Sequence, residues 1–271
     1  MTAAKPAGTP IDINVKLTSK LYDEHVKKAE SDDPLIDQTT YQKIIGKLLY
    51  LNMTRPDISF STQTLSQFLQ QPKKSHLDAV LRVIRYLKKQ PGQGLLLASD
   101  SDGQVTAFCD ADWASCPLTR KSVTGYMVKI GRSLTSWKAK KQTTVSRSSA
   151  EAEYKSLAST VSELVWLLGL FKEVGTKVQV PVQVYSDSKA AIQIAANPVY
   201  HERTKHIEID CHFIREKLQK GLIKVEYIHT KEQPADVFTK GLSRLQHEHL
   251  LSKLGVLNIF APPSLKGSVV I

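Results

Sequence analysis

The sequence predicts an α/β protein, with a mixed five-stranded sheet and flanking helices, preceded by a small α-helical segment. Three observations lead to this prediction. Apolar residues recur with helical spacing between residues 38 and 90. Short runs of β-branched and aromatic residues replace this pattern after the segment ASDSDG. Helices and strands then alternate, and the whole order β-β-β-α-β-α-α-β-α is typical of a layered α/β domain.

The first part of the chain divides into a polar segment and a helical one. Residues 1–33 contain early prolines and a glycine and run into ESDDP, so we expect an extended or flexible segment. Residues 34–98 carry apolar stripes in YQKIIGKLLYLNM, ISFSTQTLSQFL and HLDAVLRVIRYLKKQ, and PGQG ends the last stripe. About three helices are therefore expected in this segment.

Residues 99–260 are expected to form the α/β domain, and residues 261–271 a C-terminal tail. VTAFCD is a short strand, and SVTGYMVKIGRSLTSWK predicts a hairpin that turns at Gly131 and Arg132. SSAEAEY opens a long helix with one apolar stripe. The strand VPVQVYSD, the helices SKAAIQIAAN and IEIDCHFIREKLQK and the strand LIKVEYIH follow, and PADVFTK is expected to start a last helix.

The charge of the chain favours a polyanionic partner. Its 271 residues include 37 Lys and Arg against 26 Asp and Glu, a formal net charge of +11 at pH 7. Nucleic acid is the most obvious partner for such a balance. The basic residues that we expect to meet a duplex are Arg120, Lys121, Arg132, Lys138, Lys140, Lys141, Arg147, Arg203 and Lys205.

Cysteine usage and hydropathy bear on the compartment. The three cysteines form no CxxC pair, and the first ten residues contain no apolar signal-peptide core. We therefore expect an intracellular protein, cytoplasmic or nuclear, that is not secreted. No apolar run reaches the length that crosses a bilayer, so no membrane partner is expected.

Two glutamates stand at the start of the long helix and need separate explanations. Ser148 and Glu151 match a capping box, in which the glutamate bonds back to the cap amide, so Glu151 has a structural role. Glu153 lies on the shoulder of the apolar stripe, where it would project along the edge of the sheet. Taken alone, its presence is explained by the preference of a helix N-terminus for acidic residues.

Three aspartates stand at comparable places in the predicted fold. Asp110 ends the first strand, Asp187 the fourth, and Asp236 opens the last helix, and each alone is an ordinary turn or cap residue. Sites gather at such strand ends, so these residues and Glu153 are candidates to meet. Four adjacent carboxylates repel one another unless hard cations neutralise them. Ligation by oxygen alone favours Mg²⁺ or Mn²⁺ over zinc. Two such ions about 4 Å apart would clamp a phosphodiester.

Three stretches carry a resemblance to a known family. CDADWASCPLTRKSVTGYMVKIGRSLTSWKAKKQTTVSRSSAEAEY, VYSDSKAAIQIAANPVYHERTKHIEIDCHFIRE and QPADVFTK closely resemble the ribonuclease H domain of Ty1/copia-type retrotransposon Pol polyproteins, in particular those of plant copia elements. The likeness runs from Pro34 to Ile259. The helical part resembles the thumb and connection segment that follows the polymerase palm, and the chain contains no YxDD polymerase motif.

This resemblance implies an RNase H-like fold and a set of site residues. The metal-binding and catalytic acids of the family fall on Asp110, Glu153, Asp187 and Asp236, and AEYKSL matches the setting of the family's glutamate. His229 corresponds to a mobile histidine that assists the release of metal and product; the equally weighted alternative is a hydrogen-bonded strand-end histidine. The implied function is a metal-dependent endoribonuclease that hydrolyses the RNA strand of RNA·DNA hybrids by a two-metal-ion mechanism.

Two other functions compete with this interpretation. An integrase or transposase nuclease uses the same kind of sheet and acids, but it places the glutamate last, whereas the order here is Asp, Glu, Asp, Asp. A non-catalytic, host-retained remnant could instead act as a nucleic-acid or protein binding module. A hybrid-cleavage assay distinguishes the enzyme from the module.

Overall fold

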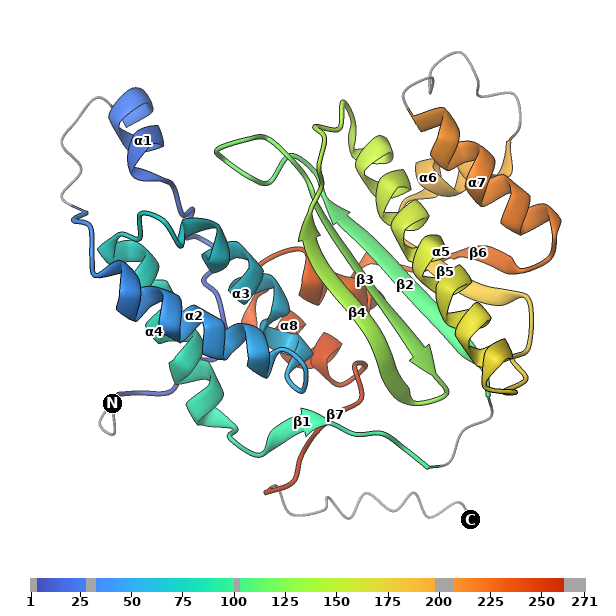
Figure 1. Ribbon diagram of the computed structural model, residues 1–271, viewed down its shortest axis with the longest axis horizontal. Coiled ribbons are helices and arrows are strands. Elements are labelled where there is room, and N and C mark those ends of the chain that lie inside the picture. Colours follow the sequence, from blue (N-terminus) through green and yellow to red (C-terminus); the bar gives the residue numbers. More distant parts are fainter. Residues whose placement is uncertain (1–3, 28–32, 100–102, 198–206, 261–271) are drawn as a thin grey trace.

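The computed structural model describes residues 4–27, 33–99, 103–197 and 207–260. A helical unit (blue to teal in Figure 1) lies beside a five-stranded sheet that has helices packed on it (Figure 1). The C-terminal helix of the described chain lies near the helical unit, so segments far apart in sequence meet at the junction.

The helical unit consists of α2 (Gln38–Leu51), α3 (Ser59–Leu65) and α4 (Lys74–Lys89), with the short helices η2 (Pro56–Ile58) and η3 (Ser66–Phe68) between them. The helices predicted between residues 38 and 90 are confirmed. Their apolar stripes face one another and form a separate hydrophobic core. The buried side chains of this core include Tyr41, Ile45, Leu48, Ile58, Leu65, Phe68, Val80, Val83 and Tyr86.

The N-terminal residues run along this helical unit. The described part is extended from residue 5 to residue 18 apart from bends and turns, before the one-turn α1 (Lys20–Tyr22) and η1 (Asp23–Lys27). The amide of Ala7 donates to the carbonyl of Arg85 in α4 at 3.2 Å, and Leu17 is buried in the core of the unit. The polar N-terminal segment is therefore packed along α4.

The sheet has the strand order β4-β3-β2-β5-β6. The strands are β2 (Val105–Asp112), β3 (Val123–Ile130), β4 (Ser133–Lys141), β5 (Val182–Ser186) and β6 (Ile223–Tyr227). The first three form an antiparallel meander, and β5 and β6 add to β2 in parallel. The predicted mixed five-stranded sheet and its hairpin turn are confirmed.

Helices cover the two faces of the sheet unequally. The helices α5 (Ser149–Glu173), α6 (Lys189–Ala196) and α7 (Glu208–Gln219) pack on one face, with their apolar side chains against inward-facing residues of β2, β3 and β5. The opposite face carries η6 (Pro234–Phe238) and α8 (Arg244–Leu251) around a smaller core. Because side chains alternate along each strand, neighbouring residues of β2 belong to different cores.

Two parts of the chain differ from the prediction or were missed by it. PADVFTK was expected to start an α-helix, but it forms only the 3₁₀-helix η6. This helix ends at Thr239, which takes φ −117°. The hydroxyl of Thr239 donates a hydrogen bond to Asp110. The segments β1 (Gln93–Leu95) and β7 (Val256–Asn258) form a two-stranded antiparallel sheet. Three-residue strands carry too little alternation to be recognised in a sequence.

A buried polar network joins the helical unit to α8. Asp57 accepts hydrogen bonds from the guanidinium of Arg55 at 2.9 and 2.7 Å, from the amide of Gln93 at 3.0 Å and from the hydroxyl of Tyr86 at 2.6 Å. The same hydroxyl contacts His247 in α8. Burial of so many polar groups is tolerated because each of these contacts satisfies a donor or an acceptor.

Candidate metal centre

Strand pairing brings two of the predicted site residues to the same edge of the sheet. In the parallel pair formed by β2 and β5, Cys109 lies opposite Ser186, and each is followed by an aspartate. Asp110 is 1% exposed and lies at the carboxyl end of β2, while Asp187 follows the last residue of β5. Parallel strands present their carboxyl ends at one edge, which is where α/β sheets place their sites.

A glycine in the neighbouring strand lets η6 approach this edge. Gly125 of β3 lies opposite Asp110. A Cβ atom at this position would lie 2.5 Å from Cγ2 of Thr239 and 2.9 Å from Cβ of Phe238, too close for any residue but glycine. The absence of a side chain at Gly125 therefore positions η6, and with it Asp236, against the sheet.

The two glutamates at the start of α5 have different surroundings. Ser148 is the N-cap, as predicted, and accepts from the amide of Glu151 at 3.2 Å. The carboxylate of Glu151 accepts from the amide of Arg147 at 2.8 Å, one residue ahead of the predicted partner, and pairs with Lys155 at 2.7 Å. The carboxylate of Glu151 therefore stabilises the start of α5. Oε2 of Glu153 is buried and has no hydrogen-bond partner among the described residues.

Three of the four predicted acids form a tight cluster. One carboxylate oxygen from each of Asp110, Glu153 and Asp187 lies within 4.8 Å of the others. Burial and the charges of Asp110 and Asp187 raise the pKa of Glu153 to about 9. Burial and the charge of Asp110 likewise raise the pKa of Asp187. Three carboxylates in this arrangement resist simultaneous ionisation unless a cation joins them.

The fourth acid, Asp236, is linked to the cluster through a lysine. Nζ of Lys240 lies 3.0 Å from Oδ1 of Asp236 and 3.3 Å from Oδ2 of Asp110. Burial and the charge of Asp110 raise the pKa of Asp236 to about 7, although Lys240 acts in the opposite direction. Burial opposes the charged form of Lys240, but the carboxylates of Asp110 and Asp236 raise its pKa above the ordinary value.

Sequence reasoning missed Thr239 and Lys240. The hydroxyl of Thr239 donates to Oδ2 of Asp110, so consecutive residues after η6 both contact this carboxylate. The spacing of four residues between Asp236 and Lys240 was a usable signal, because it is the spacing at which opposite charges pair in helical segments. In this chain the pair forms at the end of a 3₁₀-helix.

His229 lies just beyond β6 and is exposed. It is the N-cap of η5 (Thr230–Glu232), and its Nδ1 accepts from the amide of Lys231 at 3.2 Å. This hydrogen bond is the one expected of a strand-end histidine. Assistance in the release of metal and product stays a prediction for His229.

The donor set fits a hard divalent cation. The three clustered ligand atoms are carboxylate oxygens, the type that Mg²⁺ and Mn²⁺ prefer. The buried Oε2 of Glu153 is an acceptor that a cation would satisfy. The residues are therefore suited to metal binding both in their chemistry and in their spacing.

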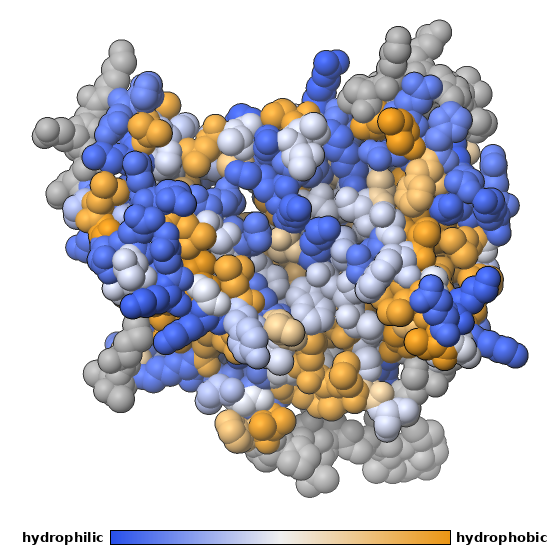
Figure 2. All heavy atoms as spheres, viewed as in Figure 1, coloured by the Kyte–Doolittle hydropathy of each residue, from blue (hydrophilic) through white to orange (hydrophobic). Residues whose placement is uncertain are grey.

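A basic groove lies along α5, which lines it from Lys155 to Trp166. It has a volume of about 770 Å³ and is lined by lysines of β4 and α5, among them Lys138, Lys140 and Lys155. Trp166 of α5 lines it as well and is 60% exposed. Figure 2 shows hydrophilic side chains across the upper middle of this face, over the end of β4 and the start of α5. The predicted contacts Arg203 and Lys205 lie outside the described residues.

Among the residues that the structure describes, none of the helices combines the length and the hydropathy needed to cross a membrane. The three cysteines are buried and unpaired.

Comparison with known proteins identifies relatives for almost the whole chain. No family model matches it. The chain is 42% identical over 264 residues to the retrovirus-related Pol polyprotein from transposon RE1 of Arabidopsis thaliana, an alignment that covers 97% of this chain and 17% of the polyprotein. It is 36% identical over 249 residues to the corresponding polyprotein from transposon TNT 1-94 of Nicotiana tabacum, covering 92% of this chain and 18% of the relative.

Among solved structures, LC11-RNase H1 in complex with an RNA/DNA hybrid matches 50% of this chain and 94% of its own, with 13% identity and a TM-score of 0.39. A likeness at this level says nothing about the site. The polyprotein relatives extend well beyond this chain, which spans about a sixth of their length. With 36–42% identity over more than nine tenths of its residues, the chain is a homologue of one segment of the Pol polyproteins of Ty1/copia-type retrotransposons.

Proposed function

We propose that this chain is a metal-dependent ribonuclease H that hydrolyses the RNA strand of RNA·DNA hybrids. The observation that carries the proposal is the meeting of carboxylate oxygens from Asp110, Glu153 and Asp187 within 4.8 Å. The relationship to a segment of Pol polyproteins supports it. Hydrolysis adds water across the P–O3′ bond of the RNA, and leaves a 5′-phosphate and a 3′-hydroxyl.

The four acids are assigned to metal binding in this proposal. When bound, two divalent cations supply the neutralisation of the phosphodiester charge and the activation of water. Asp110 is the residue shared by both halves of the site, since it contacts the carboxylate cluster on one side and Lys240 on the other. The hydroxyl of Thr239 holds the Asp110 carboxylate in orientation. Asp236 completes the set from η6.

The basic groove is assigned to the sugar–phosphate backbone of the hybrid. The side chain of Gln142, which lines the groove, donates to the carbonyl of Ala152 at 3.0 Å, so the groove adjoins the helix turn that carries Glu153. Lysines on such a surface position a duplex by contacts with phosphates, without reading its sequence. Affinity for the hybrid is then expected to fall steeply with salt.

A cleavage assay on a labelled RNA·DNA hybrid with Mg²⁺ tests the proposal. Wild type is expected to cleave the RNA strand, and Asp110→Asn and Glu153→Gln to lower the rate by at least about 100-fold, because each replaces a charged carboxylate assigned to metal binding with a neutral amide. Glu151→Gln is the matched control two residues away. It loses a helix-start contact but keeps the metal ligands, so cleavage at a temperature where it is folded should persist.

The same variants give a readout that does not depend on cleavage. Mg²⁺ is expected to raise the Tm of wild type and of Glu151→Gln, and not that of Glu153→Gln, because only ligands that bind the folded state stabilise it. Hybrid binding without cleavage in wild type would instead indicate the non-catalytic binding module. Cleavage that persists in Asp110→Asn would show that the activity arises elsewhere.

The role of His229 needs a kinetic separation. If this histidine assists product release, His229→Ala lowers the multiple-turnover rate and leaves the single-turnover rate of cleavage unchanged. If His229 only caps η5 by accepting a hydrogen bond from the amide of Lys231, both rates stay close to those of wild type.

A further inference from the structure

Lys240 brings a positive charge into the carboxylate site. Its Nζ contacts carboxylate oxygens of both Asp236 and Asp110, at 3.0 and 3.3 Å. Its side chain is 32% exposed, so it is held in the site although it has access to solvent. Among the described residues, the four predicted acids of the site are therefore accompanied by the ammonium group of Lys240.

The backbone holds this lysine in place. The amide of Lys240 donates to the carbonyl of Asp236 at 3.2 Å, which closes the turn that follows η6. The preceding residue, Thr239, bonds Asp110 through its hydroxyl. Because Gly125 lets this turn lie against β3, the position of the ammonium group is fixed by the packing of η6 and not by one long flexible side chain alone.

The acids thus fall into two groups that share Asp110. Asp110, Glu153 and Asp187 form the tight cluster, and Glu153 retains a buried oxygen without a hydrogen-bond partner among the described residues. Asp110 and Asp236 form the second group, and an ammonium group already bridges them. A divalent cation that bound to these same oxygens, Oδ2 of Asp110 and Oδ1 of Asp236, would compete with Nζ for them.

We propose that the ammonium group of Lys240 occupies one of two cation positions in the site and competes with a divalent ion for that position. The inference rests on the proposed function only for the expectation that the acids bind divalent ions. One ion then binds to Asp110, Glu153 and Asp187 with Lys240 in place. A second ion binds to Asp110 and Asp236 only when the ammonium group moves away.

Counting bound Mn²⁺ by electron paramagnetic resonance tests this inference on the full chain. Wild type is expected to bind one ion at least tenfold more tightly than a second. Lys240→Met and Lys240→Gln are expected to bind the second ion at least tenfold more tightly than wild type does, because no ammonium group competes with it. The control is Lys253→Met, which removes a lysine of similar exposure, 29%, that pairs with Glu232.

A double-variant cycle separates direct competition from a general effect of lost positive charge. In an Asp236→Asn background the second position lacks a ligand, so Lys240→Met should no longer tighten the second ion. Tightening that survives in this background overturns the inference, and so does equal affinity of the two positions in wild type. Unchanged Mn²⁺ binding in both Lys240 variants would also overturn the inference, and an absence of Mn²⁺ binding in wild type would overturn it as well.

The inference and the proposed function fail in different experiments. Wild type that binds ions in the expected order but cleaves no hybrid overturns the ribonuclease proposal and leaves the role of Lys240 standing. Wild type that cleaves hybrid while Lys240→Met and Lys240→Gln bind Mn²⁺ as wild type does leaves the ribonuclease standing and removes the competition.

Discussion

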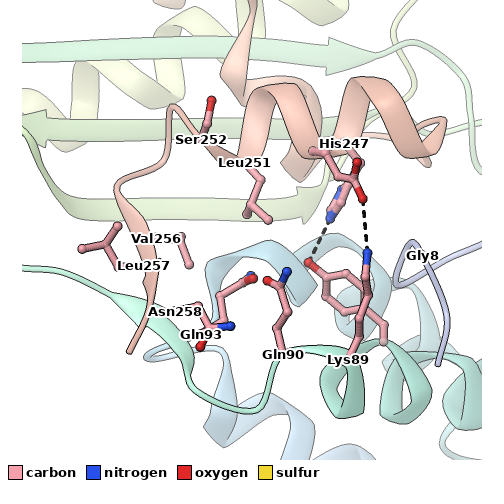
Figure 3. Close-up of a pocket in the computed structure, with 12 residues that line it drawn as sticks. Gly8, Lys89, Gln90, Gln93, His247, Leu251, Ser252, Val256, Leu257 and Asn258 are labelled. Carbon is pink, nitrogen blue, oxygen red and sulfur yellow. Dashed lines mark hydrogen bonds and ion pairs between the residues drawn. The ribbon is translucent and has the colours of Figure 1, made fainter. Parts of the chain in front are cut away.

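The hydroxyl group of Tyr86 lies 2.9 Å from Nε2 of His247, a contact between residues 161 positions apart. Figure 3 shows the side chain of His247 pointing from α8 toward α4, the helix that contains Tyr86. Because the hydroxyl donates to Asp57, Nε2 of His247 is the donor in this contact. The phenol group of Tyr86 is therefore one of the contacts that join the helical unit to α8, together with the ion pair of Lys89 and Glu248 at 3.2 Å.

Tyr86→Phe is expected to lower the free energy of unfolding by about 1–3 kcal/mol. The substitution keeps the ring but removes a buried hydroxyl with two partners, and leaves the imidazole of His247 without an acceptor. Urea unfolding measures the change. Tyr50→Phe is the matched control, since Tyr50 is 78% exposed, and it should shift the free energy by less than about 0.5 kcal/mol. An equal effect of both substitutions would show that the contact does not join the two parts.

The order of elements and the edge of the sheet that carries the site were accessible from the sequence. Both depend on patterns within single segments: the period of apolar residues, a glycine at a hairpin turn, and a serine ahead of a long amphipathic helix. Asp110 and Asp187 follow residues that lie opposite each other in neighbouring parallel strands, so their meeting follows from the strand order. The distinction between Glu151 and Glu153 was visible as capping-box spacing.

The remaining features depend on contacts between distant segments. The ion pairs of Lys240 with Asp110 and Asp236 require η6 to lie against β3, which Gly125 permits. A glycine within a strand pattern does not say which segment approaches it. The burial of Leu17 in the helical core was hidden by the polar composition of its neighbours.

Stability is expected to fall on acidification through the titration of His76. Nδ1 of this buried histidine accepts from the amide of Lys73 at 3.0 Å, and its Nε2 lies 3.0 Å from the carbonyl of Thr18. Burial and the adjacent Lys73 ammonium lower the pKa of His76 to about 4, against the opposing charges of Asp33 and Asp23. Between pH 6.5 and 4 the unfolded chain then binds a proton that the folded protein does not.

The free energy of unfolding should therefore decrease as the pH falls through this window, by about 3 kcal/mol from His76. Urea unfolding at several pH values measures the slope for wild type and for His76→Gln, in which the slope should be shallower. His25→Gln removes an exposed histidine and should keep the wild-type slope. If His76→Gln keeps it as well, His76 does not titrate as described.

Gly125→Ala is expected to damage both stability and the metal site. Its Cβ would meet Thr239 and Phe238 at 2.5 and 2.9 Å, so η6 has to move, at a cost of about 1–3 kcal/mol in overpacking. Because η6 carries Asp236, the variant should also bind Mg²⁺ more weakly, which appears as a smaller Mg²⁺-induced rise in Tm.

Gly46→Ala in α2 is the matched control for this substitution. Apart from the neighbouring backbone of α2 itself, no described residue has an atom within 4 Å of a Cβ at Gly46, so alanine should stabilise the helix by about 0.5–1 kcal/mol and leave Mg²⁺ binding unchanged. A Gly125→Ala protein with wild-type stability and the full Mg²⁺ response would mean that the close approach of η6 is not needed for the site.

The lysines of the basic groove are expected to control the affinity for a hybrid. Lys138 and Lys140 are two residues apart on β4, so their side chains leave the same face of the strand. In an Asp110→Asn background, which prevents cleavage, replacing both by alanine should reduce the slope of log affinity against log salt by about 2, roughly one for each phosphate contact. Fluorescence anisotropy of a labelled hybrid at several salt concentrations measures this slope.

Lys172→Ala with Lys177→Ala is the control of equal charge. Both lysines are exposed and lie near or beyond the end of α5, whereas the carboxylates lie at its start, and α5 rises by about 1.5 Å per residue over 25 residues. The control pair should leave the salt dependence unchanged. If both pairs weaken binding equally, the hybrid is attracted by the net charge of the chain and not by the groove.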